Sequence, residues 1–165
     1  MTQSLLPDQV VELARRVVEE NAALGRTVAV AESCTGGLVA AAITEIPGSS
    51  KVLDRGFVTY SNEAKNGSLG VANDILDAFG AVSVACVYAM AQGALERSKA
   101  DVAVAISGIA GPDGGSAQKP VGTVVFARAV RGSDRPEAES KLFDEQDRSG
   151  VRLQATLCAL ELLLP

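Results

Sequence analysis

Residues 27 to 37, TVAVAESCTGG, join a short apolar run to a glycine-rich turn. The run from Thr27 to Glu32 has the length and composition of a buried strand. The Ala-rich residues 38 to 46 end at a Pro-Gly pair and predict a short helix that begins near Thr35 or Gly36. A strand, a glycine-rich turn and a helix in succession indicate an α/β fold.

The rest of the chain continues this alternation in both directions. An amphipathic helix is predicted over residues 8 to 24, ahead of the first strand. The later segments are a strand at 57 to 61 with a helical turn at 62 to 65, a helical turn at 74 to 79, a helix at 83 to 98, strands at 101 to 106 and 121 to 130, a turn at 131 to 136, an edge strand at 140 to 143 and a helix at 150 to 164. We expect a single domain over residues 1 to 165, built as a three-layer α/β/α sandwich around a mixed, mostly parallel sheet.

Composition excludes several classes of protein. The chain has 165 residues, 47% of them hydrophobic, which is typical of a globular protein with one core. A net charge of −5, without any run of Lys or Arg, argues against a nucleic-acid partner. The first residues do not have the basic and apolar regions of a signal peptide, and no stretch approaches membrane-spanning length. We therefore expect a cytoplasmic protein without a membrane partner.

The residue types available for catalysis are restricted. The chain contains no histidine, so the usual general base and the Ser-His-Asp and Cys-His arrangements are absent. Three cysteines, Cys34, Cys86 and Cys158, are widely spaced and form no CxxC pair for zinc or redox chemistry. Without a flanking cation or imidazole, Cys34 is better explained by packing than as a nucleophile. Acid–base chemistry must then use Lys, Tyr, Asp or Glu.

The first candidate site segment is the turn at residues 33 to 37. Ligands of open α/β sheets bind beyond the carboxyl ends of the strands, and Ser33 lies at such an end. The backbone N–H groups of Thr35, Gly36 and Gly37 lie near a helix N-terminus, where they could hold a phosphate or an oxyanion. The alternative is that SCTGG is only a tight turn, capped by Ser33 or Thr35.

Two further segments follow other predicted strands. Tyr60 and Lys65 flank a strand-to-helix turn, so both side chains can reach the edge where Ser33 lies. A desolvated lysine can accept the proton of a serine hydroxyl, and Tyr60 could relay that proton or hold Lys65 in place. The alternatives are a solvated helix lysine and an ordinary strand tyrosine. In residues 107 to 115, Ser107 and Gly108 would let the backbone approach a ligand.

Four blocks of sequence together resemble a known family. They are AESCTGG at 31 to 37, RGFVTYSNEAK at 55 to 65, GAVS at 80 to 83 and ISGIAGPDGGSAQKPVGTV at 106 to 124. In this order they resemble the CinA C-terminal domain family over nearly the whole chain. The resemblance implies a nicotinamide-nucleotide amidohydrolase, which converts nicotinamide mononucleotide to nicotinic acid mononucleotide and ammonia in pyridine nucleotide salvage. Some relatives carry an additional amino-terminal domain, and this chain looks like the stand-alone form.

Position by position, the resemblance assigns the catalytic residues. Ser33 would be the nucleophile and Lys65 and Tyr60 its activating partners, with Ser50 in PGSS as a weaker candidate. The reaction would pass through an acyl-enzyme and require no metal or cofactor. The residues expected to bind the substrate are Thr35, Gly36, Gly37, Ser50, Ser107, Gly108 and Arg148.

Two departures from the family pattern bear on this expectation. Gln146 precedes Asp147-Arg148 where the pattern has glycine, and the segment is one residue longer. This departure argues against carrying a phosphate role over to Arg148 or Arg152 on the resemblance alone. The helix start SVACVYAM at 83 to 90 is unusually apolar and indicates a homodimer interface.

The competing hypothesis is a non-catalytic module that binds a nucleotide and regulates a partner protein.

Overall fold

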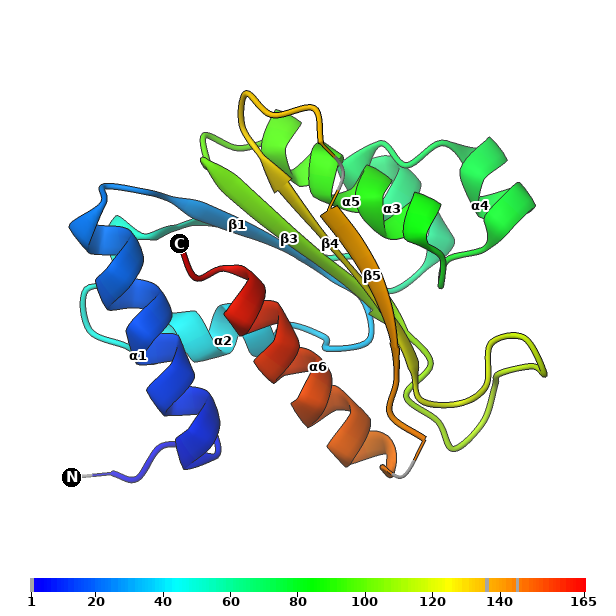
Figure 1. Cartoon of the computed structure of the whole chain (residues 1–165), viewed down its shortest axis with the longest axis horizontal. Helices are drawn as coiled ribbons and strands as arrows, with labels where there is room; N and C mark the ends of the chain where they lie inside the picture. Colours follow the sequence, from blue (N-terminus) through cyan, green and yellow to red (C-terminus); the bar gives the residue numbers. More distant parts are fainter. Residues whose placement is uncertain (1, 136, 145) are drawn as a thin grey trace.

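One five-stranded sheet forms the centre of the molecule (Figure 1). The computed structural model describes residues 2 to 135, 137 to 144 and 146 to 165. The strands are β1 (Val28–Glu32), β2 (Leu53–Val58), β3 (Val102–Gly108), β4 (Thr123–Val130) and β5 (Glu137–Leu142), in the spatial order β2-β1-β3-β4-β5. β1 is parallel to β2 and to β3, whereas β4 is antiparallel to β3 and β5. The predicted mixed, mostly parallel sheet is therefore confirmed.

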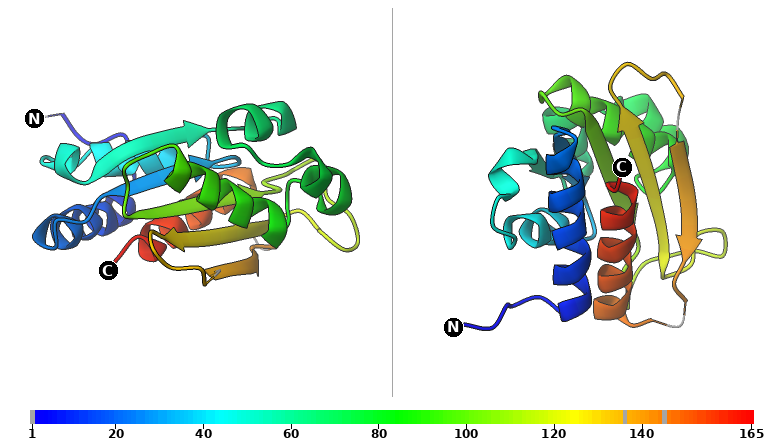
Figure 2. Two further views of the ribbon diagram at one scale, coloured as in Figure 1. Left: turned by 90° about the horizontal axis from the view of Figure 1, so that it is seen from above. Right: turned by 60° about the vertical axis from the view of Figure 1, so that its left-hand side comes forward.

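Helices cover both faces of the sheet (Figures 1 and 2). One face carries α1 (Asp8–Ala23), α2 (Leu38–Thr44) and α6 (Arg148–Leu162). The other face carries α3 (Asn62–Leu69), α4 (Asn73–Phe79) and α5 (Val84–Glu96). A short 3-10 helix, η1 (Ser49–Lys51), links α2 to β2. This arrangement is the three-layer α/β/α sandwich expected from the sequence. Within the described residues, no helix is long and apolar enough to cross a membrane.

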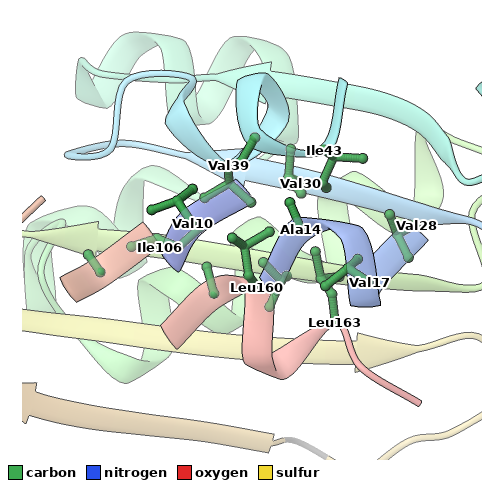
Figure 3. Close-up of a cluster of buried hydrophobic side chains, with 14 of the residues drawn as sticks. Val10, Ala14, Val17, Val28, Val30, Val39, Ile43, Ile106, Leu160 and Leu163 are labelled. Atoms are coloured by element: carbon green, nitrogen blue, oxygen red, sulfur yellow. The ribbon is translucent and has the colours of Figure 1, made fainter. Parts of the chain in front are cut away.

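The two faces of the sheet differ in side-chain size. Val28 and Val30 of β1 and Ile106 of β3 point into the core beneath α1, α2 and α6 (Figure 3). The alternate positions, Ala29 and Ala103 among them, face α5. Because successive strand residues point to opposite faces, a Val-Ala alternation makes one face bulky and the other flat. The flat face lets α5 pack close to the sheet.

Several element boundaries differ from those predicted. β2 begins at Leu53, four residues before the predicted strand, because its Asp54, Arg55 and Gly56 give an edge strand little hydrophobic signal. α5 begins at Val84, one residue after the predicted start, and Val84 is 48% exposed. The predicted turn at 131 to 136 ends at residue 136, which lies outside the described residues.

Candidate active site

The three candidate segments meet at the carboxyl edge of β1, β2 and β3. The N–H of Ser33 donates to the carbonyl of Ile106 at 2.9 Å, which joins the ends of β1 and β3. The N–H of Thr59 donates to the carbonyl of Glu32 at 2.8 Å, which joins the ends of β1 and β2. In this register Ser33 lies beside Thr59 on one side and beside Ser107 on the other. The carboxyl ends of the three parallel strands therefore lie side by side, with Ser33 in the middle.

Lys65 is the buried partner of Ser33. Its side chain comes from α3 and is only 1% exposed, and Nζ lies 3.1 Å from Ser33 Oγ. Nζ also donates to the main-chain carbonyls of Thr59 at 2.8 Å and Tyr60 at 3.1 Å. A carbonyl can only accept, so these two oxygens take two N–H bonds of the amine. In the neutral form of Lys65 the remaining lone pair then faces the hydroxyl of Ser33.

Burial also changes the protonation of this lysine. Desolvation lowers the pKa of Lys65, and the nearby thiols of Cys86 and Cys34 oppose that shift only partly. The neutral amine is thus populated at a lower pH than in a solvated lysine. The alternative of an ordinary solvated helix lysine does not describe Lys65 in this structure.

Tyr60 contacts Lys65 through its main chain. Its side chain is 61% exposed, and the phenol oxygen accepts a hydrogen bond from Arg148 Nη2 at 3.2 Å. Arg148 also donates from Nη1 to the carbonyl of Gly111 at 2.7 Å. Within the described residues the phenol makes no hydrogen bond to Ser33 or Lys65. Tyr60 thus holds Lys65 by its carbonyl, while its exposed ring contacts Arg148.

Glu32 accepts from one of the three backbone N–H donors that the sequence predicted for the substrate, that of Gly37, and from the Thr35 hydroxyl. This fully buried carboxylate accepts from Thr35 Oγ1 at 2.7 Å and from the N–H of Gly37 at 3.2 Å. It also accepts from the first turn of α2, at 2.9 Å from Val39 N and 3.1 Å from Ala40 N. The N–H of Gly36 donates to the carbonyl of Ser33 at 3.0 Å. Of the three N–H groups of residues 35 to 37, only that of Thr35 has no acceptor among the residues that the structure describes.

A second arginine lies against the same turn. Arg152 Nε donates to the carbonyl of Cys34 at 3.1 Å, and Nη2 lies 3.4 Å from the carbonyl of Thr35. Sequence patterns predict no structural role for Glu32 or Arg152. The signal for Glu32 was a carboxylate at a strand end just before a helix start, where such a group caps backbone donors. Local sequence could not place Arg152, which is 118 positions from Cys34.

Comparisons with known proteins identify the family of this chain. The family model of the CinA C-terminal domain matches residues 10 to 165. The chain belongs to the CinA C-terminal domain family. It is 52% identical to the nicotinamide-nucleotide amidohydrolase PncC of Escherichia coli K12 over 158 residues, which cover 94% of this chain and 93% of that protein. The PncC of Enterobacter agglomerans is 55% identical over 150 residues, with 89% and 90% covered.

A longer relative and a solved structure complete the comparison. The putative competence-damage inducible protein of Symbiobacterium thermophilum is 56% identical over 146 residues, but this chain spans only 34% of its length. The crystal structure of the competence/damage inducible protein CihA from Agrobacterium tumefaciens matches with a TM-score of 0.94 at 50% identity, covering 98% of this chain and 97% of that one. The fold is thus that of solved CinA proteins.

The remaining candidates of this CinA domain fall into two groups. Ser107 is buried at the carboxyl end of β3, and a side chain at Gly108 would lie 2.8 Å from Val124 Cγ2. The register of β1 and β3 places Ser107 beside Ser33, and Gly108 must be small because β4 passes close to it. Ser50 is exposed in η1, just before β2 begins. Because β2 is parallel to β1, the structure places Ser50 at the opposite edge from Ser33 and does not bring it to the site.

The longer segment before α6 of this CinA domain does not displace Arg148 and Arg152 from the site. Asp147 accepts from the N–H of Gly150 at 2.7 Å and caps α6, which begins at Arg148. Residue 145, within the longer segment, lies outside the described residues. The departure from the family pattern therefore leaves both Arg148 and Arg152 at the site. Among the described residues, no group of three Cys, Asp or Glu side chains gathers as metal ligands do.

Proposed function

We propose that this protein hydrolyses the carboxamide of nicotinamide mononucleotide to give nicotinic acid mononucleotide and ammonia. The observation that carries the proposal is the buried Nζ of Lys65, 3.1 Å from Ser33 Oγ. A lysine held out of water against a serine is costly to stability, and a module that only binds nucleotides has no need of it. The names of the PncC relatives support this substrate.

In the proposed mechanism Ser33 and Lys65 share one proton. Ser33 Oγ attacks the carboxamide carbon while its proton passes to Lys65 Nζ, and the Thr35 N–H stabilises the oxyanion. Lys65 then returns the proton to the amide nitrogen, so that ammonia leaves and an acyl-serine remains. A water molecule, deprotonated by Lys65, attacks the ester and releases the carboxylate and Ser33. No step requires a metal or cofactor.

The substrate phosphate is assigned to Arg148. Arg148 is exposed, and its guanidinium is oriented by the carbonyl of Gly111 and the phenol of Tyr60. These two contacts fix its plane, which favours binding of a phosphate group through the remaining N–H donors. Ser107, beside Ser33, is the closer polar contact for the carboxamide end. The Tyr60 phenol thus acts in substrate binding rather than in proton transfer.

The experiment is a comparison of two serine variants. Ser33→Ala should lose ammonia release from nicotinamide mononucleotide by orders of magnitude and still bind the nucleotide. Ser50→Ala, at the opposite edge of the sheet, is the matched control and should keep wild-type turnover. Ammonia release from Ser33→Ala equal to that of the wild type would refute the serine mechanism. Absence of turnover in the wild type itself would favour the non-catalytic alternative.

We further propose a cytoplasmic homodimer of single-domain subunits, each spanning residues 1 to 165. Phe79 and Val84 are 57% and 48% exposed at the corner between α4 and α5, and their burial in an interface would remove apolar surface from water. Three unpaired cysteines suit a reducing compartment. Sedimentation should give a dimer for the wild type and a monomer for the double variant Phe79→Ser, Val84→Ser. A monomeric wild type would contradict the proposal.

A further inference from the structure

We infer that Arg152 is a positioning residue that orients the Cys34–Thr35 peptide so that the Thr35 N–H serves as the oxyanion donor. The inference rests on the proposed function, since an oxyanion forms only if Ser33 attacks a carbonyl carbon. It assigns Arg152 to the protein's own backbone, whereas the substrate phosphate is left to Arg148.

Arg152 uses two of the five N–H bonds of its guanidinium on carbonyls of the turn. Nε donates to the carbonyl of Cys34 at 3.1 Å, and Nη2 makes a longer contact of 3.4 Å with the carbonyl of Thr35. A Cβ added to Gly36 would lie 3.4 Å from Nη2, so the guanidinium packs directly over this glycine. The glycine, with a φ of +60°, thus allows both the turn and the close approach of the cation.

Because the peptide is planar, the contact of Arg152 with the Cys34 carbonyl also sets the direction of the Thr35 N–H. The carbonyl of Cys34 and the N–H of Thr35 belong to one trans peptide unit, so they point in opposite directions. Arg152 belongs to α6, in the layer that covers the opposite face of the sheet from α3. With the carbonyl turned toward Arg152, the Thr35 N–H is directed back toward the side where Lys65 of α3 meets Ser33. A cation on the carbonyl oxygen also polarises the peptide and strengthens its N–H as a donor.

Glu32 holds the turn in a conformation in which the Thr35 N–H has no acceptor within the protein's described residues. Its carboxylate holds the side chain of Thr35 and the N–H of Gly37 from inside the fold. The turn is thus fixed by an anion on one side and a cation on the other. The Thr35 N–H is left free among the described residues, next to the nucleophile. A preorganised donor of this kind needs no reorganisation as negative charge develops on the substrate oxygen.

The test separates a positioning role from phosphate binding. For Arg152→Gln we expect kcat to fall about 10- to 100-fold, somewhat less than the effect typical of deleting an oxyanion donor, because the N–H remains but is no longer held. We expect KM to stay within about threefold of the wild type. Arg152→Lys should recover part of the loss, since an ammonium can still reach one carbonyl. Arg15→Gln, an exposed arginine of α1, is the matched control and should behave as the wild type.

Binding is measured separately in the Ser33→Ala background, where no turnover interferes. Adding Arg152→Gln there should leave the Kd for nicotinamide mononucleotide within about threefold, whereas a phosphate ligand would weaken it more than tenfold. Such a weakening, or an unchanged kcat in Arg152→Gln, would overturn the inference. Should Arg152→Gln fail to fold by circular dichroism, Arg152→Lys carries the same comparison of kcat and Kd. A wild type that releases no ammonia would instead refute the proposed function and this inference with it.

Discussion

Lys65 depends on its burial for its chemistry. Desolvation lowers the pKa of Lys65, and in the proposed mechanism the neutral amine accepts the proton of Ser33. We therefore expect kcat/KM to rise with pH through a limb that lies below the ordinary pKa of lysine. Lys65→Arg, which stays charged, should be inactive across pH 6 to 10. A wild-type rate that is flat or falls over this range would contradict the assignment.

The same shift has a consequence for stability. The folded-state pKa of Lys65 lies below its unfolded-state value, so between the two values the unfolded chain binds more protons. The contribution of Lys65 to the free energy of unfolding should therefore increase with pH in that window. Urea unfolding of the wild type and of Lys65→Met at several pH values measures it: the difference between the two should change in favour of the wild type as pH rises.

Cys34 is adjacent to the proposed nucleophile but is not expected to react. Burial raises the pKa of its thiol to about 11, although Arg152 and Lys65 act to lower it. At neutral pH the thiol is protonated and packed in the core. We expect Cys34→Ala to keep kcat within about threefold of the wild type, and iodoacetamide at pH 7 to leave this residue unmodified. Loss of activity comparable to that of Ser33→Ala would make Cys34 the nucleophile instead.

At the scale of elements, the position of Lys65 depends on how closely α3 and α5 pack. Gly93 of α5 faces the carbonyl of Leu69 at the end of α3, and an added Cβ would lie only 2.0 Å from that oxygen. Gly93→Ala must therefore push the two helices apart and shift the helix that carries Lys65. We expect the free energy of unfolding to fall by about 1 to 3 kcal/mol, together with a lower kcat. Urea unfolding and ammonia release measure both effects.

Gly67→Ala is the matched control for that change. Gly67 lies on the exposed side of α3, and an added Cβ would meet no atom within 4 Å. Alanine in a helix is more favourable than glycine by about 1 kcal/mol, so this variant should be as stable as the wild type or more so. Equal losses of stability in the two variants would show that the contact with Leu69 does not explain the effect of Gly93→Ala.

At the scale of the whole molecule, the sandwich is asymmetric because one face of its sheet is built from alanine. Ala103, in the central strand β3, is fully buried against the α5 layer. Ala103→Leu overfills that layer, and we expect the free energy of unfolding to fall by about 1 to 3 kcal/mol. The control is Ala138→Leu on exposed β5, which should stay within about 0.5 kcal/mol of the wild type by thermal or urea unfolding. Similar losses in both would contradict a tightly packed alanine face.

The sequence by itself determined the fold class, the three layers and the edge where the candidate site lies. Residues 27 to 37 predict a strand, a turn and a helix start. Because the chain contains no histidine, Lys65 is predicted to replace it as the base. These features could be predicted because periodicity and turn chemistry act between residues close together in the chain. The site expectation of Ser33 with Lys65 depended on the same rule, that strand ends of a parallel sheet meet at one edge.

Only the tertiary structure decided what each group at that edge contacts. The phenol of Tyr60 lies with Arg148, 88 positions away, and the turn at Cys34 is held by Arg152, 118 positions away. Glu32 occupies donors that the sequence had left for the substrate, because a buried carboxylate must be hydrogen-bonded wherever the fold places it. Ser50 is excluded by the direction of β2. Such choices depend on the direction of side chains and on long-range packing, and local sequence patterns do not encode either.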